Sequence, residues 1–161
     1  RVLFRSGLGA GLSAHELQDL YVKDGGLVFP RSTTLVGRTS GWLRDGLRLF
    51  YRRWDATALR RLLEAKLGDR LFGESSARLV IPAFDGKHSE VYVYKTPHHP
   101  DYQTDRDERM VNVALATAAA PTYFRPLEHG GYVLVDGGVW ANNPVMLAVI
   151  EAMTEIGRAH V

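Results

Sequence analysis

The stretch that decides the fold is GYVLVDGGVWANNPVMLAVIEAM, residues 131–153. Its apolar run at 132–135 predicts a buried β-strand, and the Asp-Gly-Gly sequence at 136–138 predicts a sharp turn after it. Proline is typical of the first position of a helix, so we expect a helix from Pro144 through Met153. A strand, a tight turn and a helix in this order are typical of a layered α/β domain.

Upstream of this stretch, predicted helices and strands alternate. Ser13-Ala14-His15-Glu16 has the pattern of a capping box and begins a helix that ends at Asp24-Gly25-Gly26. Small residues dominate 110–120, which predicts a helix that can lie close to a sheet and that ends at Pro121. The remaining predictions are helices at 43–51 and 55–68 and strands at 79–84 and 91–94. Strands made of unbroken apolar runs are typical of a buried, mainly parallel sheet, so we expect a three-layer α/β/α domain.

The composition indicates one ordinary globular domain. The chain has 161 residues, of which 45% are hydrophobic and 24% charged, and these fractions argue against disorder and against a coiled coil. No apolar run approaches the roughly 20 residues of a membrane-spanning helix. The chain has no cysteine, which excludes a disulfide scaffold, a thiolate metal site and a cysteine nucleophile within it.

The two ends of the chain resemble a DNA adapter. One DNA string encodes residues 1–6, its reverse complement encodes 155–161, and that string resembles a common sequencing-library adapter. We therefore expect residues 7–154 to be one domain, truncated at both ends, between residues that are not native. Without the charges of the two ends, the formal net charge falls from +2 to zero. The basic balance then gives no reason to expect a nucleic-acid partner.

Asp136 is the first candidate for chemistry. It stands at the carboxyl end of an apolar strand, where ligands collect in open α/β sheets. Two glycines follow it and allow another backbone or a substrate to approach closely. Such a carboxylate suits a general base if burial raises its pKa. Taken alone, however, Asp-Gly-Gly is equally typical of an ordinary turn after a strand.

Two segments resemble the catalytic part of the patatin-like phospholipase family: ALATAAAPTYFRP at 114–126 and GGYVLVDGGVWANNPVMLAVIEA at 130–152. The specific features are the small-residue helix closed by Ala-Pro-Thr-Tyr-Phe, the Asp-Gly-Gly motif, and the Asn-Asn-Pro sequence beyond it. The segments 12–30, 55–69, 78–85 and 93–100 are also similar to bacterial members of that family. The resemblance covers essentially all of Leu8 to Thr154.

This resemblance implies a lipid acyl hydrolase with an α/β/α core and a Ser–Asp dyad. In the family, the serine lies in a G-x-S-x-G elbow, and a glycine-rich loop supplies the amides of the oxyanion hole. By resemblance Asp136 is the base of the dyad, and neither a metal nor a cofactor is implied. The chain contains no G-x-S-x-G, since Phe4 stands two positions before Ser6, and His15 stands two positions after Ser13. We expect the elbow upstream of Gly7 in the parent protein and expect this polypeptide to be inactive.

The residues around Asp136 receive supporting roles in the same interpretation. Gly137 and Gly138 form the turn, and Asn142, Asn143 and Pro144 brace it before the last helix. Trp140 either lines an acyl pocket or packs in the core, and the sequence favours neither.

Other features carry weaker interpretations. His88, His98, His99 and Asp101 contain metal-ligating groups, but a polar surface loop explains them better. Lys95 and Arg125 are candidates to contact a lipid phosphate, although solvated surface charges are commoner. The aromatic-rich segment 27–53 is consistent with a lid or membrane-facing element and equally with an ordinary insertion.

The predicted function is therefore the hydrolysis of phospholipid or related acyl esters, with the parent cytoplasmic or peripheral to a membrane. One alternative is a noncatalytic binding protein that keeps the scaffold without its serine. A second is a nucleotide- or partner-activated phospholipase effector of a bacterial defence system. A glycosidase that pairs Asp136 with Glu128 or Glu151 is a poor fit, since those residues are expected in a loop and far along a helix.

Overall fold

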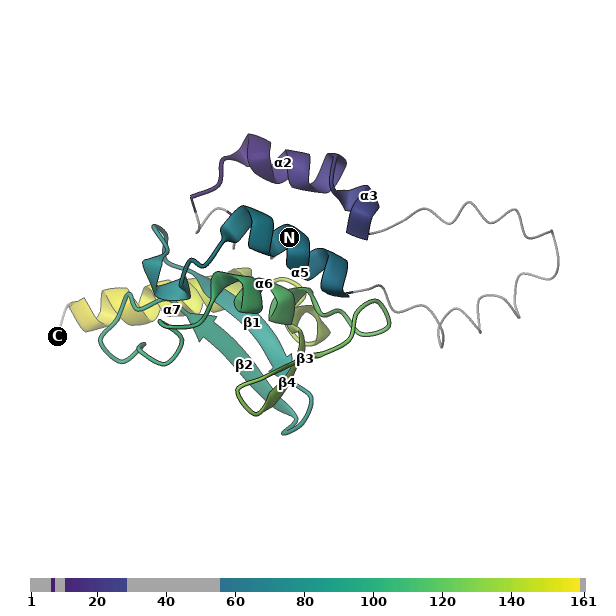
Figure 1. Cartoon of the computed structure of the whole chain (residues 1–161). Helices are drawn as coiled ribbons and strands as arrows, with labels where there is room; N and C mark the ends of the chain where they lie inside the picture. The colour runs from purple at the N-terminus through teal and green to yellow at the C-terminus, as the bar shows by residue number, and fades with distance from the viewer. Residues whose placement is uncertain (1–6, 8–10, 29–55, 160–161) are drawn as a thin grey trace, which may run out of the picture.

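The computed structural model describes residues 7, 11–28 and 56–159 (Figure 1). The helices are α2 (Ala14–Val22), α3 (Gly25–Val28), α5 (Ala56–Leu67), α6 (Met110–Ala118) and α7 (Val145–Ala159). Single 3₁₀ turns are formed by η1 (Phe72–Glu74) and η2 (Gly137–Val139). The strands are β1 (Val80–Asp85), β2 (Glu90–Lys95), β3 (Leu127–His129) and β4 (Tyr132–Asp136).

The four described strands form one sheet in the order β2-β1-β4-β3. Every pairing in it is antiparallel, so the prediction of a mainly parallel sheet is wrong for the described residues. The physical reason for two of the pairings is that β1–β2 and β3–β4 are hairpins with short turns, which impose antiparallel pairing. The third pairing joins β1 to β4, which are far apart in the sequence, so no turn sets its direction. An apolar run shows that a strand is buried but carries no information about the direction of its neighbour.

The core lies where α6 meets the sheet. Eight of the nine residues of α6 are buried, and its neighbours are α5 on one side and β1 and β4 on the other. Figure 1 shows α2, α5 and α6 as successive layers above the strands. The small side chains of α6 allow this close approach, as the sequence predicted. Large buried side chains fill the remaining space; they include Phe72, Ile81, Tyr94, Met110 and Leu134.

The local signals place most helices correctly. The capping box is confirmed, because Glu16 N–H donates to Ser13 Oγ at 3.2 Å and Ser13 N–H donates to Glu16 Oε2 at 2.8 Å. Helix α5 ends before Gly68, which has a φ of +60°. Helix α7 runs six residues beyond the predicted end at Met153.

Of three further sequence predictions, one is wrong and two concern residues outside the described part of the chain. Strand β3 was not predicted, and it contains Glu128, which was expected in a loop. The predicted helix at 43–51 and all but the first two residues of the lid segment 27–53 lie outside the described residues. Among the described helices, none combines the length and apolar character needed to cross a bilayer.

Candidate functional site

Asp136 is the last residue of β4, and its main chain is fixed to the core. Its N–H donates to Ala119 O at 3.0 Å, which joins the end of β4 to the residue after α6. Its Oδ1 accepts a hydrogen bond from Gly138 N–H at 2.8 Å. No hydrogen bond from the described residues reaches Oδ2, and the residue is partly exposed. Among the described residues, one oxygen of the carboxylate is therefore held by a hydrogen bond, and the other accepts none.

The turn after Asp136 is pressed against β1. A Cβ atom built on Gly137 would lie 2.3 Å from Pro82 O, so only glycine fits at this position without a backbone shift. The amide of Ala141 returns to Gly137 O at 2.8 Å and closes the turn. The predicted role of Gly137 in forming the turn thus has a geometric basis, which is contact with a neighbouring strand.

Trp140 anchors the same turn from outside. Its Nε1–H donates to Ala83 O at 2.9 Å, so the indole bonds to β1 while its ring remains partly exposed. This hydrogen bond is a direct contact between Trp140 and β1, and it supports the packing role. The role in an acyl pocket stays a prediction.

The Asn-Asn-Pro sequence leads from the turn into α7. Asn143 Oδ1 accepts from Val145 N–H at 3.4 Å, a long contact at the first residue of the helix. Pro144 is buried, and its carbonyl accepts the N–H of Ala148 at 3.1 Å. Asn142 is exposed, and its bracing role stays a prediction.

Thr117 supports the site from α6, and the sequence analysis missed it. Its buried Oγ1–H donates to Pro82 O at 2.9 Å, the same carbonyl that Gly137 approaches. A buried hydroxyl in a mainly apolar helix needs a partner, and that mismatch is the signal that could have identified Thr117.

A pocket of about 150 Å³ lies between α5, the end of α6 and residues 124–127. Leu59, Leu115 and Phe124 give it apolar walls, and Arg60 and Arg125 are also among its lining residues. Ala119, whose carbonyl holds Asp136 N–H, belongs to the same wall. Arg125 therefore lies in a place where it can meet an anionic group, whereas Asp136 does not line the pocket.

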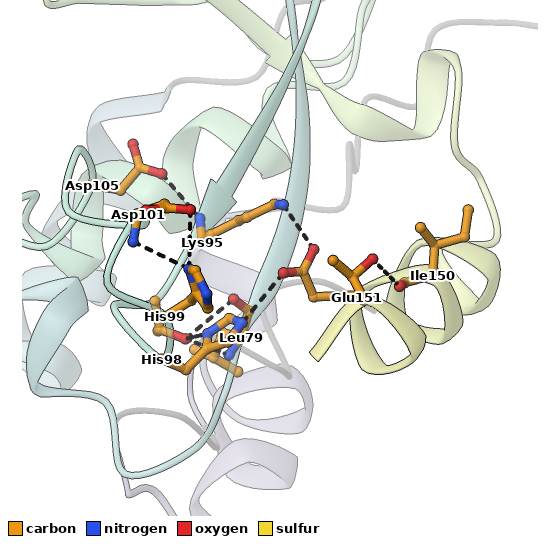
Figure 2. Close-up of polar contacts among 10 residues, drawn as sticks. Leu79, Lys95, His98, His99, Asp101, Asp105, Ile150 and Glu151 are labelled. Atoms are coloured by element: carbon orange, nitrogen blue, oxygen red, sulfur yellow. Dashed lines mark hydrogen bonds and ion pairs between the residues drawn. The ribbon is translucent and has the colours of Figure 1, made fainter. Parts of the chain in front are cut away.

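Lys95 is engaged elsewhere in the structure. Its Nζ lies 2.7 Å from Glu151 Oε2 (Figure 2). The same Nζ lies 4.2 Å from the centre of the Tyr102 ring. Burial opposes the charge on both partners, but their ion pair outweighs it, raising the pKa of Lys95 and lowering the pKa of Glu151. Lys95 is thus not poised for a lipid phosphate, and Glu151 is not poised as a second catalytic acid.

The histidines that the sequence analysis considered each have a different partner. His88 pairs with Asp85, His98 with Thr96 and Glu151, and His99 with Asp101. The described residues contain no group of three or more side chains that could hold a metal ion.

Asp85 is a buried carboxylate at the end of β1. Burial opposes its ionisation, but hydrogen bonds from Val133 N–H, from His88 and from Lys87 N–H outweigh it and lower its pKa to about 2. These bonds join the β1–β2 turn to β4. Its role is therefore structural, since its oxygens are occupied by the protein itself.

Comparison with known proteins gives a consistent result. The family model described as patatin-like phospholipase matches residues 6–149. The chain is 31% identical over 153 residues to a cGAMP-activated phospholipase of Escherichia coli, covering 93% of this chain and 41% of that protein. It is 31% identical over 159 residues to a cGAMP-activated phospholipase of Vibrio cholerae, covering 93% and 43%. It is 32% identical over 156 residues to patatin-like protein 2 of Arabidopsis thaliana, covering 89% and 37%. The chain thus spans about two fifths of the length of these relatives.

Proposed function

The chain belongs to the patatin-like phospholipase family, and we propose that it carries the carboxylate half of a Ser–Asp dyad that hydrolyses acyl esters of phospholipids or related lipids. Asp136 is the base of this dyad. The observation that carries the proposal is the orientation of its carboxylate, with Oδ1 held by Gly138 N–H and Oδ2 open among the described residues. A carboxylate held in this way can accept a proton from a serine hydroxyl directly, without an intervening histidine.

The reaction follows from that placement. The serine oxygen attacks the acyl carbonyl while its proton passes to Asp136, and backbone amides stabilise the tetrahedral oxyanion. Asp136 then returns the proton to the leaving alcohol, and water releases the acyl group by the same steps. The serine comes from a part of the parent protein outside these 161 residues, because the chain contains no G-x-S-x-G. The 161-residue chain by itself is accordingly inactive.

A second candidate concerns regulation of the same activity. The relatives in Escherichia coli, Pseudomonas aeruginosa and Vibrio cholerae are named cGAMP-activated phospholipases. Their names support a parent protein that is switched on by cGAMP, which agrees with the nucleotide-activated effector considered from the sequence. The alternative is a scaffold of this family that binds lipid and has no serine.

A chimera tests the role of Asp136. Residues 7–154 replace the segment that they match in the Vibrio cholerae relative, and fatty-acid release from phospholipid vesicles is measured with and without cGAMP. We expect hydrolysis that Asp136→Asn reduces by about 10²- to 10⁴-fold, the usual contribution of a general base. Glu128→Gln, which removes an exposed carboxylate on β3, is the matched control and should leave the rate unchanged. A folded chimera whose activity survives Asp136→Asn would contradict the dyad, and so would a folded chimera without activity, because the rest of the chimera comes from a phospholipase.

A further inference from the structure

The pocket between α5, the end of α6 and residues 124–127 has the form of a small-molecule site. Its apolar walls include Leu59, Leu115 and Phe124, which are 3–7% exposed and therefore fixed in the core. The lining residues that are not apolar are Thr57 and two arginines. A preformed apolar pocket with a few polar groups is the usual form of a site for a small organic ligand.

The charges of this pocket all have one sign. Arg60 and Arg125 line it, and no carboxylate is among the described residues that do so. Cavities that stay empty in proteins are lined by apolar groups. Two arginines at one small pocket therefore favour a bound anion, which guanidinium groups hold through charge-assisted hydrogen bonds.

Arg60 is held in position by the core. Its Nη1–H donates to Asn112 Oδ1 at 3.3 Å, and Asn112 is a buried residue of α6. The same Nη1 lies 3.8 Å from Glu64 Oε1, one turn along α5. A guanidinium group carries five N–H donors, so these contacts leave donors for a ligand.

Arg125 reaches the pocket from the segment after α6. It follows the buried Phe124 and is itself exposed. Within the part of the chain that the structure describes, no carboxylate forms an ion pair with Arg125. Its planar guanidinium group can therefore bind a carboxylate through two parallel hydrogen bonds.

The size of the pocket limits what can enter it. Its volume is about 150 Å³, and an apolar cavity of that volume binds a molecule of the size of benzene, with about six carbon atoms. Sites for drug-sized molecules have about 300–1,000 Å³. The pocket therefore fits a short length of one apolar chain, and a phospholipid with two chains and a head group is too large for it.

The pocket shares a wall with the candidate catalytic site. Ala119 lines the pocket, and its carbonyl accepts the N–H of Asp136 at 3.0 Å. Leu127 also lines it and pairs with Leu134 on β4, the strand that ends at Asp136. The pocket thus adjoins the place where the proposed reaction releases its products.

We propose that this pocket binds a fatty acid, whose carboxylate pairs with Arg60 and Arg125. The methylenes next to the carboxylate pack between Leu59, Leu115 and Phe124. The choice of a fatty acid rests on the proposed function, because hydrolysis of an acyl ester releases this class of molecule. Asp136 does not line the pocket, so a fatty acid bound there is held outside the catalytic site.

The test measures ligand binding to the 161-residue chain by amide proton–nitrogen NMR correlation spectra. Hexanoate should shift the amide signals of Leu59, Leu115 and Leu127 in a saturable way. Hexanol, which lacks the charge, should bind at least about 10-fold more weakly. Each buried methylene is worth about four-fold in affinity, so acetate should bind at least about 50-fold more weakly.

Three variants locate the ligand. Arg125→Gln should weaken hexanoate binding about 10-fold, and Ala118→Leu, which fills the pocket, should abolish it. Arg61→Gln is the matched control, because Arg61 is exposed next to Arg60 on α5 and does not line the pocket, and it should leave the affinity unchanged. A melting curve of each variant checks that it remains folded.

Several results would overturn the proposal. They are binding of hexanol or acetate as tight as that of hexanoate, equal effects of Arg125→Gln and Arg61→Gln, and shifted signals confined to residues outside the pocket. Tighter binding of hexyl phosphate than of hexanoate would also overturn it, because the anion would then be a lipid phosphate.

The outcome is separate from that of the proposed reaction. The 161-residue chain contains no G-x-S-x-G, so its binding of hexanoate does not depend on hydrolysis. Calorimetric titration of the chimera described above, with and without Arg125→Gln, repeats the comparison in a longer chain. Hexanoate binding that Arg125→Gln does not weaken there would overturn the proposal, whatever the activity of Asp136→Asn.

Discussion

Replacing Gly137 by alanine is the sharpest test of how the Asp136 turn is built. The added Cβ would lie 2.3 Å from Pro82 O and 2.5 Å from Pro82 C, where ordinary contact begins at 3.4 Å. The turn and β1 must therefore separate by about 1 Å. We expect β1 to resist this movement, because Pro82 lies inside the strand and its carbonyl accepts a hydrogen bond from the buried hydroxyl of Thr117. Overpacking usually costs about 1–3 kcal/mol, and a shift of backbone places this variant near 3 kcal/mol.

The assay is urea denaturation of the 161-residue chain followed by far-ultraviolet circular dichroism. A thermal scan of the same chain checks the result, since a loss of about 3 kcal/mol lowers the melting temperature by about 6–12 °C in a protein of this size. Gly138→Ala is the matched control, because its Cβ would meet only the Asp136 carboxylate, at 3.2 Å, and we expect it to cost less than about 1 kcal/mol. If Gly137→Ala lay within about 0.5 kcal/mol of the parent sequence, the close contact between this turn and β1 would be refuted.

Three further predictions use the same denaturation assay. Thr117→Val should cost about 1–3 kcal/mol because it leaves Pro82 O buried without its side-chain donor, and a neutral result would show that the bond contributes nothing. Trp140→Phe should cost about 1 kcal/mol through loss of the bond to Ala83 O, whereas a gain in stability would contradict the anchoring role. The pKa of Asp85 is about 2 in the folded protein and 3.8 ordinarily, so its carboxylate stabilises the fold above about pH 4. That stability should fall as the pH drops from about 4 toward 2, and Asp85→Asn should remove this part of the pH dependence; an unchanged profile in the variant would exclude the effect.

Features that depend on neighbours along the chain were predictable from the sequence. Ser13 and Glu16 are three residues apart, and their side chains alone satisfy the first amides of α2. Gly68 ends α5 because its positive φ is easily adopted only by glycine. The turn at Asp136 follows from the same local chemistry, and the family resemblance then singled out its carboxylate.

Features that depend on distant partners were decided only by the tertiary structure. The direction of the strands, the contact of Gly137 with Pro82 and the pairing of Lys95 with Glu151 each join segments that are far apart in the sequence. Lys95 and Arg125 looked alike as exposed cations, yet the structure places the buried carboxylate of Glu151 opposite Lys95. The physical reason is that a residue's type and spacing fix what it can bind locally, whereas the long-range partner depends on how the layers pack. Sequence determined that Asp136 stands at the end of a strand in a sharp turn, and packing alone determined which atoms hold that turn in place.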